Sequence, residues 1–280
     1  MAVLNIVSTP IGNLKDITLR AIEVLSDSEV LYCEDTRVTR KLLSHLKIST
    51  TGKKLVSINK INEASRIDEI ISDLKDEKTV SLVVDAGTPL ISDPGNFTVS
   101  KILEFGYRVI SVPGPSSVIS ALTVSGFNTE RFYFQGFLPK KLAEKQKVLE
   151  KITNMDCTTV FFESPYRLED TIKIVTQMVD HNRKICIVKE LTKLNESVLV
   201  DTASKINEEL QKTVIKGEYV ILISPNTKAE LINDEDAITL YKKCLESGMD
   251  SKDSLVYVSK QLNLKKNHLY RILKIQSQVS

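Results

Sequence analysis

The first half of the chain alternates short apolar runs with longer stretches in which apolar residues recur every three or four positions. Between residues 63 and 75, Ile67, Ile70, Ile71 and Leu74 follow the i, i+3, i+4, i+7 spacing of one helix face. Continuous apolar runs are typical of strands buried on both faces, and their alternation with helices predicts a largely parallel sheet covered by helices. The expected strands are LNIVS (4–8), VLYC (30–33), LVSI (55–58), SLVV (81–84) and RVISV (108–112), and the expected helices begin near residues 18, 39, 63, 96 and 116.

The same alternation begins again near Arg131. Its strand-like runs are FYFQ, TVFF, KICIV, SVLV and EYVILI, and a Lys-rich helix is expected over residues 140–153. After Pro225 only helical patterns remain. We therefore predict the α/β fold class, with an N-terminal α/β domain at residues 1–126, a second α/β domain at 127–228 and a small helical appendage at 229–280.

Three segments rich in glycine and proline follow predicted strands: TPIGN (9–13), DAGTPLISDPG (85–95) and PGPSS (113–117). Parallel strands end at a common edge of their sheet, where open α/β folds bind ligands, so we expect the three segments to line one site. They offer backbone groups with little side chain in the way. None contains G-x-x-x-x-G-K-S/T, and TPIGN has one glycine where a dinucleotide fingerprint needs three. The pattern favours a nucleoside-type ligand without phosphates.

Composition places the chain among soluble globular proteins. Hydrophobic residues make up 42% of its 280 residues and charged residues 26%. The longest apolar runs, such as YVILI (219–223), are far shorter than the roughly 20 residues of a membrane helix. The N-terminus lacks the basic and apolar regions of a signal peptide, so we expect a cytoplasmic protein. Cysteines and histidines are scattered without metal-ligand spacing, so neither a metal site nor a disulfide framework is expected.

Charge is concentrated at the C-terminus. Residues 251–280 carry six Lys or Arg and one acid, a net charge of +5, which leaves −3 for the other 250 residues of a chain whose total is +2. Apolar residues in this region predict two short amphipathic helices joined by NLKK, like a helix-turn-helix. A basic helical pair of this kind favours a polyanionic partner over a purely structural cap.

Eight blocks of sequence, in order, resemble one known family. They are STPIGNLKDITLRA, CEDTR, VVDAGTPLISDPG, VPGPSS, GFLPKK, FFESPYRL, KELTK and KGEYVILI, and together they span roughly residues 3–224. The family is the tetrapyrrole methylase superfamily of S-adenosylmethionine-dependent methyltransferases. Within it the chain looks closest to the branch that methylates small-subunit ribosomal RNA.

The resemblance implies two α/β domains with S-adenosylmethionine in the cleft between them, and a homodimer. The small-molecule methylases of the superfamily carry a Gly-rich first loop where this chain has STPIG, and an Asp where it has Thr88. The ribosomal branch looks like this chain at both places, which weakens a porphyrinoid substrate. The superfamily's cofactor contacts fall on Ile11, Ala86, Gly87, Thr88, Ile91, Ser116, Ser117, Glu163 and Thr192, to which we add Asp85 because it heads the second loop.

The implied reaction is methylation of the ribose 2′-hydroxyl of a cytidine in the decoding region of 16S rRNA. A ribose hydroxyl is scarcely ionised at neutral pH, so a general base is expected. The candidates are acids at strand ends: Glu34, Asp35, Asp93, Glu163 and Glu190. For each of them a helix cap or a structural ion pair is the alternative role. Asp35 is the first choice, with Glu34 and Arg37 beside it, because an acid and a phosphate anchor could act together there.

Binding of RNA calls for cations along the phosphate path and for aromatic rings on which bases stack. For the Lys-rich helix, a solvated face is the alternative. Tyr166 is expected to pack against the protein rather than to stack on a base. The predicted RNA contacts are Arg40, Lys41, Lys140, Lys141, Arg167, Lys265, Lys266, Arg271 and Lys274.

Two other functions remain open on residue patterns alone. A small-molecule methylase of the same fold would act on protein-free small substrates and would not need the basic C-terminus. A nucleic-acid-binding module that keeps the cofactor fold without catalysis would bind RNA and transfer no methyl group. The ordered motifs favour the rRNA methyltransferase.

Overall fold

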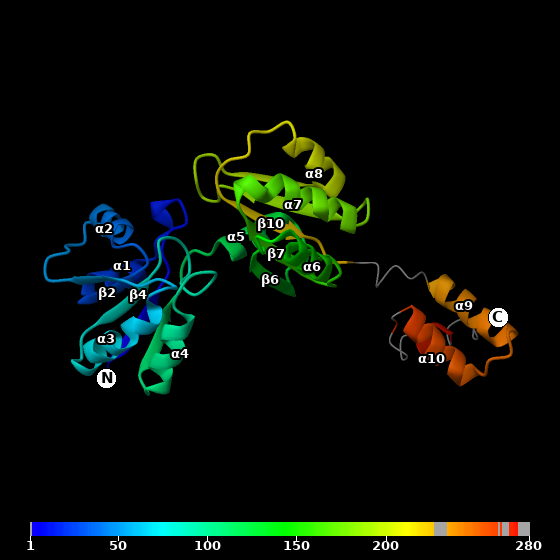
Figure 1. Ribbon diagram of the computed structural model, residues 1–280, viewed down its shortest axis with the longest axis horizontal. Coiled ribbons are helices and arrows are strands. Elements are labelled where there is room, and N and C mark those ends of the chain that lie inside the picture. The colour runs from blue at the N-terminus through cyan, green and yellow to red at the C-terminus, as the bar shows by residue number, and fades with distance from the viewer. Residues whose placement is uncertain (1, 227–233, 263, 265–268, 274–280) are drawn as a thin grey trace.

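Two five-stranded sheets and a pair of C-terminal helices make up the protein (Figure 1). The computed structural model describes residues 2–226, 234–262, 264 and 269–273. The first sheet has the strand order β3-β2-β4-β1-β5, and every pairing in it is parallel, which confirms the predicted parallel sheet. Its strands are β1 (Val3–Val7), β2 (Val30–Cys33), β3 (Lys54–Ser57), β4 (Val80–Val83) and β5 (Arg108–Val112).

Helices cover the first sheet on both faces. On one face α3 and α4 bury Ile70 and Ile102 against Leu4 and Tyr32. On the other face α1 and α2 bury Leu25 and Leu43 in a second cluster with strand residues. The short 3-10 turn η1 (Leu14–Asp16) leads into α1 (Leu19–Asp27), and the remaining helices are α2 (Thr36–His45), α3 (Glu63–Lys75) and α4 (Asn96–Glu104).

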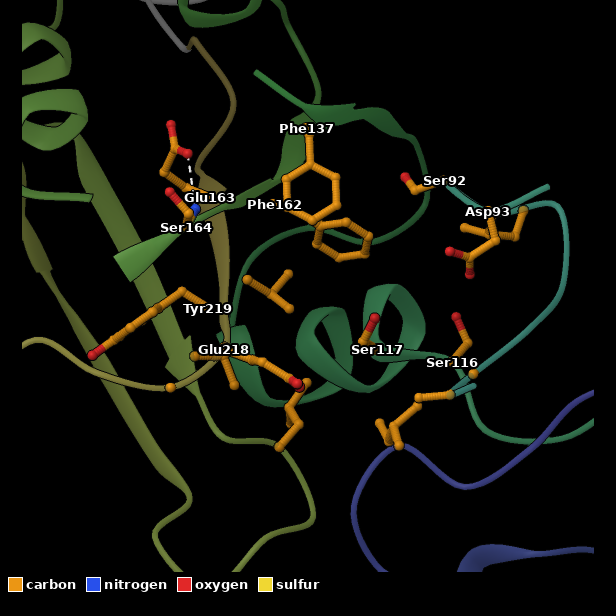
Figure 2. Close-up of a pocket in the computed structure, with 18 of the residues that line it drawn as sticks. Ser92, Asp93, Ser116, Ser117, Phe137, Phe162, Glu163, Ser164, Glu218 and Tyr219 are labelled. Carbon is orange, nitrogen blue, oxygen red and sulfur yellow. Dashed lines mark hydrogen bonds between the residues drawn. The ribbon is translucent and has the colours of Figure 1, made fainter. Parts of the chain in front are cut away.

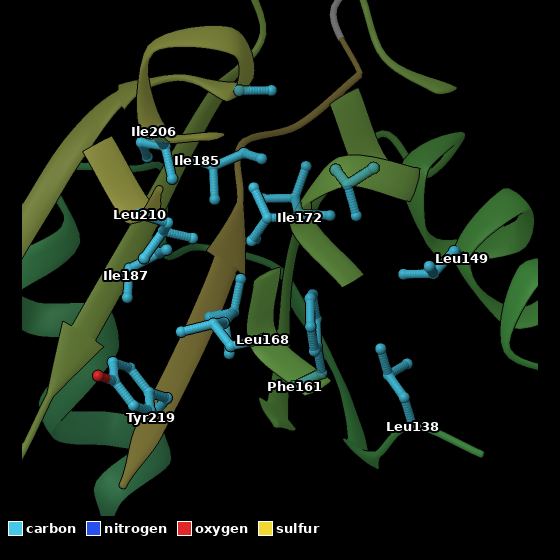
Figure 3. Close-up of a cluster of buried hydrophobic side chains, with 14 of the residues drawn as sticks. Leu138, Leu149, Phe161, Leu168, Ile172, Ile185, Ile187, Ile206, Leu210 and Tyr219 are labelled. Carbon is cyan, nitrogen blue, oxygen red and sulfur yellow. The ribbon is translucent and has the colours of Figure 1, made fainter. Parts of the chain in front are cut away.

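The second sheet is mixed, with the strand order β6-β7-β10-β8-β9. Only β6 and β7 are parallel, and β10 runs antiparallel between β7 and β8 although both precede it in the chain. Three helices cover one face, where Phe161, Leu168 and Ile172 form the centre of the core (Figure 3). The elements are β6 (Phe132–Phe137), β7 (Thr158–Glu163), β8 (Lys184–Lys189), β9 (Ser197–Thr202), β10 (Tyr219–Ile223), α6 (Leu142–Thr153), α7 (Pro165–Met178) and α8 (Ala203–Leu210).

Helix α5 (Ser117–Ser125) covers the opposite face of the second sheet. Its residues Val118, Ala121 and Leu122 are buried against Val220 and other apolar residues of β7, β8 and β10. This helix precedes the predicted domain boundary at 126, so the sequence prediction assigned it to the first domain. The pattern of α5 is apolar, and apolarity alone does not tell which of two neighbouring sheets a helix will cover.

The C-terminal helices pack on each other and lie clear of both sheets (Figure 1). They are α9 (Asp234–Glu246) and α10 (Ser251–Gln261), and residues 269–273 are helical as well. Ala237, Cys244, Val258 and Leu269 form their buried centre. The side chain of Asp250 caps α10 by accepting hydrogen bonds from the backbone N–H groups of Lys252 and Asp253. Three residues of the predicted basic patch, Lys265, Lys266 and Lys274, lie outside the described residues.

Candidate active site

The three loops predicted to share an edge are joined by hydrogen bonds. Thr9 and Gly87 exchange two backbone hydrogen bonds, of 2.9 and 3.1 Å, which tie the first loop to the second. The Ser8 hydroxyl donates to the Thr88 hydroxyl at 3.3 Å. Thr88 in turn donates to the Pro115 carbonyl at 3.0 Å, which adds the third loop. The prediction that these loops line one edge of the parallel sheet is confirmed.

The first loop also meets the second domain, at a glycine that the sequence analysis did not single out. A Cβ atom on Gly12 would lie 2.5 Å from Lys193 Cγ, 2.7 Å from Thr192 Oγ1 and 3.0 Å from the Leu191 carbonyl oxygen. The backbone N–H of Asn13 donates to Thr192 Oγ1 at 3.0 Å. Gly12 therefore permits a close approach between the domains. Thr192, predicted to bind the cofactor, makes this interdomain contact.

A cavity of about 420 Å³ lies between the domains (Figure 2). This volume falls within the range of small-molecule sites. Asp85 and Thr192 are not among the lining residues, and the Asp85 carboxylate instead accepts a hydrogen bond from the Asp35 N–H at 3.1 Å. Eight residues predicted to contact the cofactor do line the cavity: Ile11, Ala86, Gly87, Thr88, Ile91, Ser116, Ser117 and Glu163.

The second domain supplies an apolar wall that the sequence analysis missed. Phe137 at the end of β6 and Phe162 near the end of β7 meet edge to face, with ring centroids 5.3 Å apart. Figure 2 shows both rings across the cavity from Asp93 and Ser116. The adjoining wall comes from Val188, Leu191 and residues 217–220 of β10 and the turn before it. These residues were missed because apolar residues at strand ends have no pattern that separates a ligand wall from core.

Every charged side chain that lines the cavity is acidic, as far as the described residues go. They are Asp93, Glu163 and Glu218, and none of the described lining residues is Lys or Arg. A phosphate ligand would meet unfavourable charge in such a cavity. A nucleoside that carries a positive charge would meet favourable charge. The lining therefore fits S-adenosylmethionine, whose sulfonium is a cation, and agrees with the expectation of a ligand without phosphates.

Glu163 is buried and its carboxylate is fully engaged. One oxygen accepts hydrogen bonds from the Ser164 N–H at 2.8 Å and from Arg167. The other oxygen accepts from the Thr171 hydroxyl at 2.8 Å and lies 3.7 Å from Lys145 Nζ. Figure 2 shows the hydrogen bond to Ser164 and the carboxylate turned away from the centre of the cavity. With its lone pairs engaged, Glu163 is poorly placed to act as a general base.

Two cations, Lys145 and Arg167, lie beside the Glu163 carboxylate and do not face solvent as predicted. Lys145 of the Lys-rich helix is buried and donates to the Thr171 hydroxyl at 3.0 Å, so it is not part of a solvated face. Arg167 also donates to the Leu138 and Pro139 carbonyls, each at 3.2 Å. These contacts occupy its guanidinium and argue against the prediction that Arg167 anchors a phosphate. Instead it ties the start of α7 to the loop that follows β6.

Asp35 has the structural role of a helix cap. Its carboxylate accepts from the Arg37 backbone N–H at 2.8 Å and forms an ion pair with the Arg37 guanidinium at 2.6 Å. This cap starts α2 at Thr36, three residues before the helix start predicted near residue 39. Hydrogen bonds from Arg37 lower the pKa of Asp35 to about 2. Such a carboxylate is a weak base at neutral pH, and neither Asp35, Glu34 nor Arg37 lines the cavity.

Asp93 differs from Asp35 in both its position and the direction of its pKa shift. It lies at the end of the second loop and lines the cavity. Burial raises the pKa of Asp93 to about 6, repulsion from Glu34 and Asp85 adds to the rise, and Lys60 opposes it. Burial also raises the pKa of Asp85, with repulsion from Glu34 as the next cause. Glu190, the remaining candidate base, forms an ion pair with Lys193 at 3.1 Å and accepts a hydrogen bond from the Glu218 N–H at 2.9 Å.

Tyr166 contradicts the prediction that it packs against the protein. Its residue surface is 95% exposed, immediately after Pro165, which lines the cavity. Helix α7 begins at Pro165, and Tyr166 points from its first turn into solvent because the turn's buried face is taken by Leu168.

Five other predicted RNA contacts are exposed and remain predictions: Arg40, Lys41, Lys140, Lys141 and Arg271. In the described part of the chain no group of three or more His, Cys, Asp or Glu could hold a metal ion, and no helix could cross a membrane.

Comparisons with known proteins agree with the fold. A family model described as Tetrapyrrole (Corrin/Porphyrin) Methylases matches residues 3–207. The chain is 42% identical over 251 residues to the ribosomal RNA small subunit methyltransferase I of Rickettsia prowazekii (strain Madrid E), which covers 89% of this chain and 87% of that protein. The protein of the same name from Halalkalibacterium halodurans is 36% identical over 276 residues, with coverages of 96% and 93%.

Solved structures give the same fold at low sequence identity. The methyltransferase CobJ superposes with a TM-score of 0.61 at 14% identity, covering 81% of this chain and 95% of its own. A cobalt precorrin-4 methyltransferase superposes with a TM-score of 0.58 at 18% identity, with coverages of 79% and 94%. At these identities the likeness establishes the fold alone.

Proposed function

We propose, from the premise that this chain belongs to the tetrapyrrole (corrin/porphyrin) methylase family, that it is an S-adenosylmethionine-dependent methyltransferase of small-subunit ribosomal RNA. We infer that its target is the ribose 2′-hydroxyl of a cytidine in the decoding region. The observation that carries the proposal is the length of the similarity, which covers 96% of this chain in a relative named for this activity. The acidic cavity between the domains supports it independently.

The residues that would hold the cofactor come from both domains. Backbone groups of Ala86, Gly87 and Thr88 and the hydroxyls of Ser116 and Ser117 offer hydrogen bonds on one side. The Phe137 and Phe162 wall offers an apolar surface for the adenine ring on the other. When bound, S-adenosylmethionine supplies an electrophilic methyl group on a positively charged sulfur. The protein holds the acceptor hydroxyl in line with that methyl group and excludes water from the cavity.

The target RNA would reach the cavity past Tyr166 and the exposed cations. Tyr166 stands next to the cavity rim, where a base turned out of the decoding region could stack on its ring. Arg40 and Lys41 on α2, and Lys140 and Lys141 before α6, are exposed cations that could contact the RNA backbone. The cytoplasm, where ribosomal subunits are assembled and modified, is the proposed location.

Replacing Tyr166 by alanine is expected to raise the KM for the RNA substrate and to leave the affinity for S-adenosylmethionine unchanged. Loss of one stacked base costs about 1–3 kcal/mol, or roughly 5- to 150-fold in affinity. Steady-state kinetics on small ribosomal subunits and calorimetry with the cofactor measure the two quantities. Tyr166→Phe is the matched control, because it keeps the ring and should behave like the wild type. An unchanged KM in the alanine variant would remove Tyr166 from the RNA site.

A homodimer is also proposed. Several apolar residues of α4, of α5 and of the segments that follow them are exposed in the single chain, including Phe97, Leu103, Phe105 and Ile119. A second copy of the chain could cover these residues, since exposed apolar residues of this number often mark an interface. Light scattering coupled to size-exclusion chromatography would give the molar mass. A mass of one chain at micromolar concentration would contradict the dimer.

The proposed function is tested by methyl transfer from radiolabelled S-adenosylmethionine. Purified small subunits, protein-free 16S rRNA and a porphyrinoid are offered separately, and the modified nucleotide is mapped in any labelled RNA. Label on a ribose of the small subunit supports the proposal. Label on the porphyrinoid alone would favour a small-molecule methylase. Tight RNA binding without any label would favour a binding module.

A further inference from the structure

The loop that carries Asp93 is fixed in an unusual conformation. Leu90 and Ser92 both have left-handed backbone angles, with φ of 74° and 72°, although neither is glycine. Such angles cost free energy and persist only where the surroundings enforce them, most often at functional sites. In Figure 2 the loop brings Ser92 and Asp93 to the first-domain side of the cavity, above Ser116.

Hydrogen bonds hold the loop on both sides of Asp93. Before it, Lys60 Nζ donates to the Ser92 carbonyl at 2.9 Å. After it, the buried Glu63 carboxylate accepts from the Gly95 N–H at 3.1 Å and from the Thr98 N–H at 2.7 Å. Glu63 thereby caps the start of α4 and fixes the chain two residues beyond Asp93. The position of the Asp93 side chain is set by these neighbours and not by contacts of its own carboxylate.

The Asp93 carboxylate differs from the other acids near the cavity in having no protein partner. Among the described residues it forms neither a hydrogen bond nor an ion pair, whereas Glu163 is saturated by Ser164, Arg167 and Thr171. Glu218, the other acid in the lining, is 77% exposed and forms an ion pair with Lys193 at 2.9 Å. Asp93 is thus the acid of the described cavity lining whose oxygens are free to accept a proton from a ligand.

The charge around Asp93 suits a base that works near neutral pH. Glu34 and Asp85 repel its negative charge, Lys60 attracts it, and burial is the largest influence, so that its pKa lies at about 6. At pH 7 most molecules therefore carry the ionised form, which is the form able to accept a proton. The raised pKa also makes the carboxylate a stronger base than Asp35, whose pKa lies at about 2.

We propose that Asp93, and not Asp35, is the general base of the methyl transfer; this inference rests on the proposed function. The Asp93 carboxylate accepts the proton of the acceptor hydroxyl while the hydroxyl oxygen forms its bond to the methyl carbon. The carbon–sulfur bond breaks in the same step, and its electron pair stays on sulfur, which becomes a neutral thioether. The proton then leaves Asp93 for solvent. Charge and atoms balance without a metal ion or a further reactant.

The first test compares Asp93→Asn with the wild type in single-turnover methylation of small ribosomal subunits. Loss of a general base is expected to slow the step about 100- to 10,000-fold. Affinity for S-adenosylhomocysteine, whose sulfur is uncharged, should stay within about twofold of the wild type in calorimetry, because asparagine keeps the shape of the side chain. Affinity for S-adenosylmethionine should fall because the cavity lining loses an acid, so the single turnovers are run at saturating cofactor. Asp68→Asn, an exposed acid on α3, is the control for loss of one negative charge and should behave like the wild type.

The outcomes separate this inference from the proposed function. No methylation by the wild type would refute the function. An active wild type with an equally active Asp93→Asn variant would overturn Asp93 as base, and so would a variant whose defect lies in cofactor affinity with an unchanged single-turnover rate. Loss of turnover in Asp35→Asn but not in Asp93→Asn would return the role to Asp35.

The second test reads the ionisation of Asp93 directly, in protein without cofactor. The folded state holds the proton more tightly than the unfolded state, whose Asp has a pKa of about 4. Ionisation therefore destabilises the wild-type fold as pH rises from about 4 to about 6. Asparagine does not ionise, so the Asp93→Asn variant does not undergo this destabilisation. Its melting temperature should match that of the wild type near pH 4 and exceed it by a growing margin up to about pH 6. Above about pH 6 the difference in melting temperature should stay constant. A constant difference across the whole range would overturn the inference.

Discussion

Replacing Gly12 by valine is expected to abolish tight binding of S-adenosylmethionine while both domains stay folded. The side chain would enter the space now shared with Lys193, Thr192 and the Leu191 backbone, where even a Cβ atom lies 3.0 Å or less from each. The lysine can turn away, but the Leu191 carbonyl belongs to the backbone and cannot move alone. Overpacking of this kind costs about 1–3 kcal/mol, or roughly 5- to 150-fold. It falls on the contact that brings the two walls of the cavity together, so calorimetric titration should show the loss as weaker cofactor affinity.

Gly106→Ala is the control for glycine replacement in general. Gly106 has a φ of 79° with open space around the position of a Cβ atom. Alanine there is strained, so the free energy of unfolding should fall while cofactor affinity stays as in the wild type. Normal cofactor affinity in Gly12→Val would show that the domains can separate without harm to the site.

Replacing Glu163 by alanine is expected to lower the free energy of unfolding by about 3–5 kcal/mol, the usual loss when one member of a buried ion pair is removed. Lys145 is left with 6% of its side chain exposed and without the carboxylate, and Arg167 loses its charged partner. The Ser164 N–H and the Thr171 hydroxyl also lose their acceptor. Urea unfolding followed by circular dichroism measures the effect.

Two further variants decide whether buried charge is the cause. Glu218→Ala removes an acid from the same cavity, but that acid is 77% exposed, so the loss should stay below about 1 kcal/mol. The pair Glu163→Leu with Lys145→Met replaces the buried charges by apolar side chains of similar size and should recover much of the stability. Equal losses in Glu163→Ala and Glu218→Ala would contradict this account of the cluster.

The first wall of the site was predictable from the sequence because parallel strands bring the loops at their carboxyl ends to one edge of the sheet. Once SLVV and RVISV are assigned as parallel strands, Gly87 and Ser116 must come to that edge together. The second wall was not predictable in this way. The order β6-β7-β10-β8-β9 brings Phe162 beside Val220, and nothing local in either strand encodes that antiparallel pairing.

Single residues were misjudged where one residue type serves several roles. Asp35 precedes a helix, where a cap and a catalytic acid have the same sequence signature, and the hydrogen bonds from Arg37 decide for the cap. Arg167 was predicted to contact RNA because nothing in its local sequence shows that the buried Glu163 carboxylate binds its guanidinium. The same carboxylate lies beside Lys145, which removes that lysine from the exposed face of the Lys-rich helix. Tyr166 is exposed because it falls on the outward face of the first turn of α7. Gly12 gave no signal, since a close interdomain approach is a property of the assembled fold.

The position of β10 in the middle of the second sheet has a consequence for biosynthesis. A growing chain completes the first sheet with β5 at Val112, but β7 and β8 cannot be bridged until Tyr219–Ile223 have left the translating ribosome. Until then α5 has no finished sheet on which to bury Val118 and Leu122. Nascent chains that end before β10 should have a folded N-terminal domain and an α5 whose apolar face is exposed. Chaperones could bind that exposed face. Such chains also lack the second wall of the cavity, so the methyl donor cannot stabilise them.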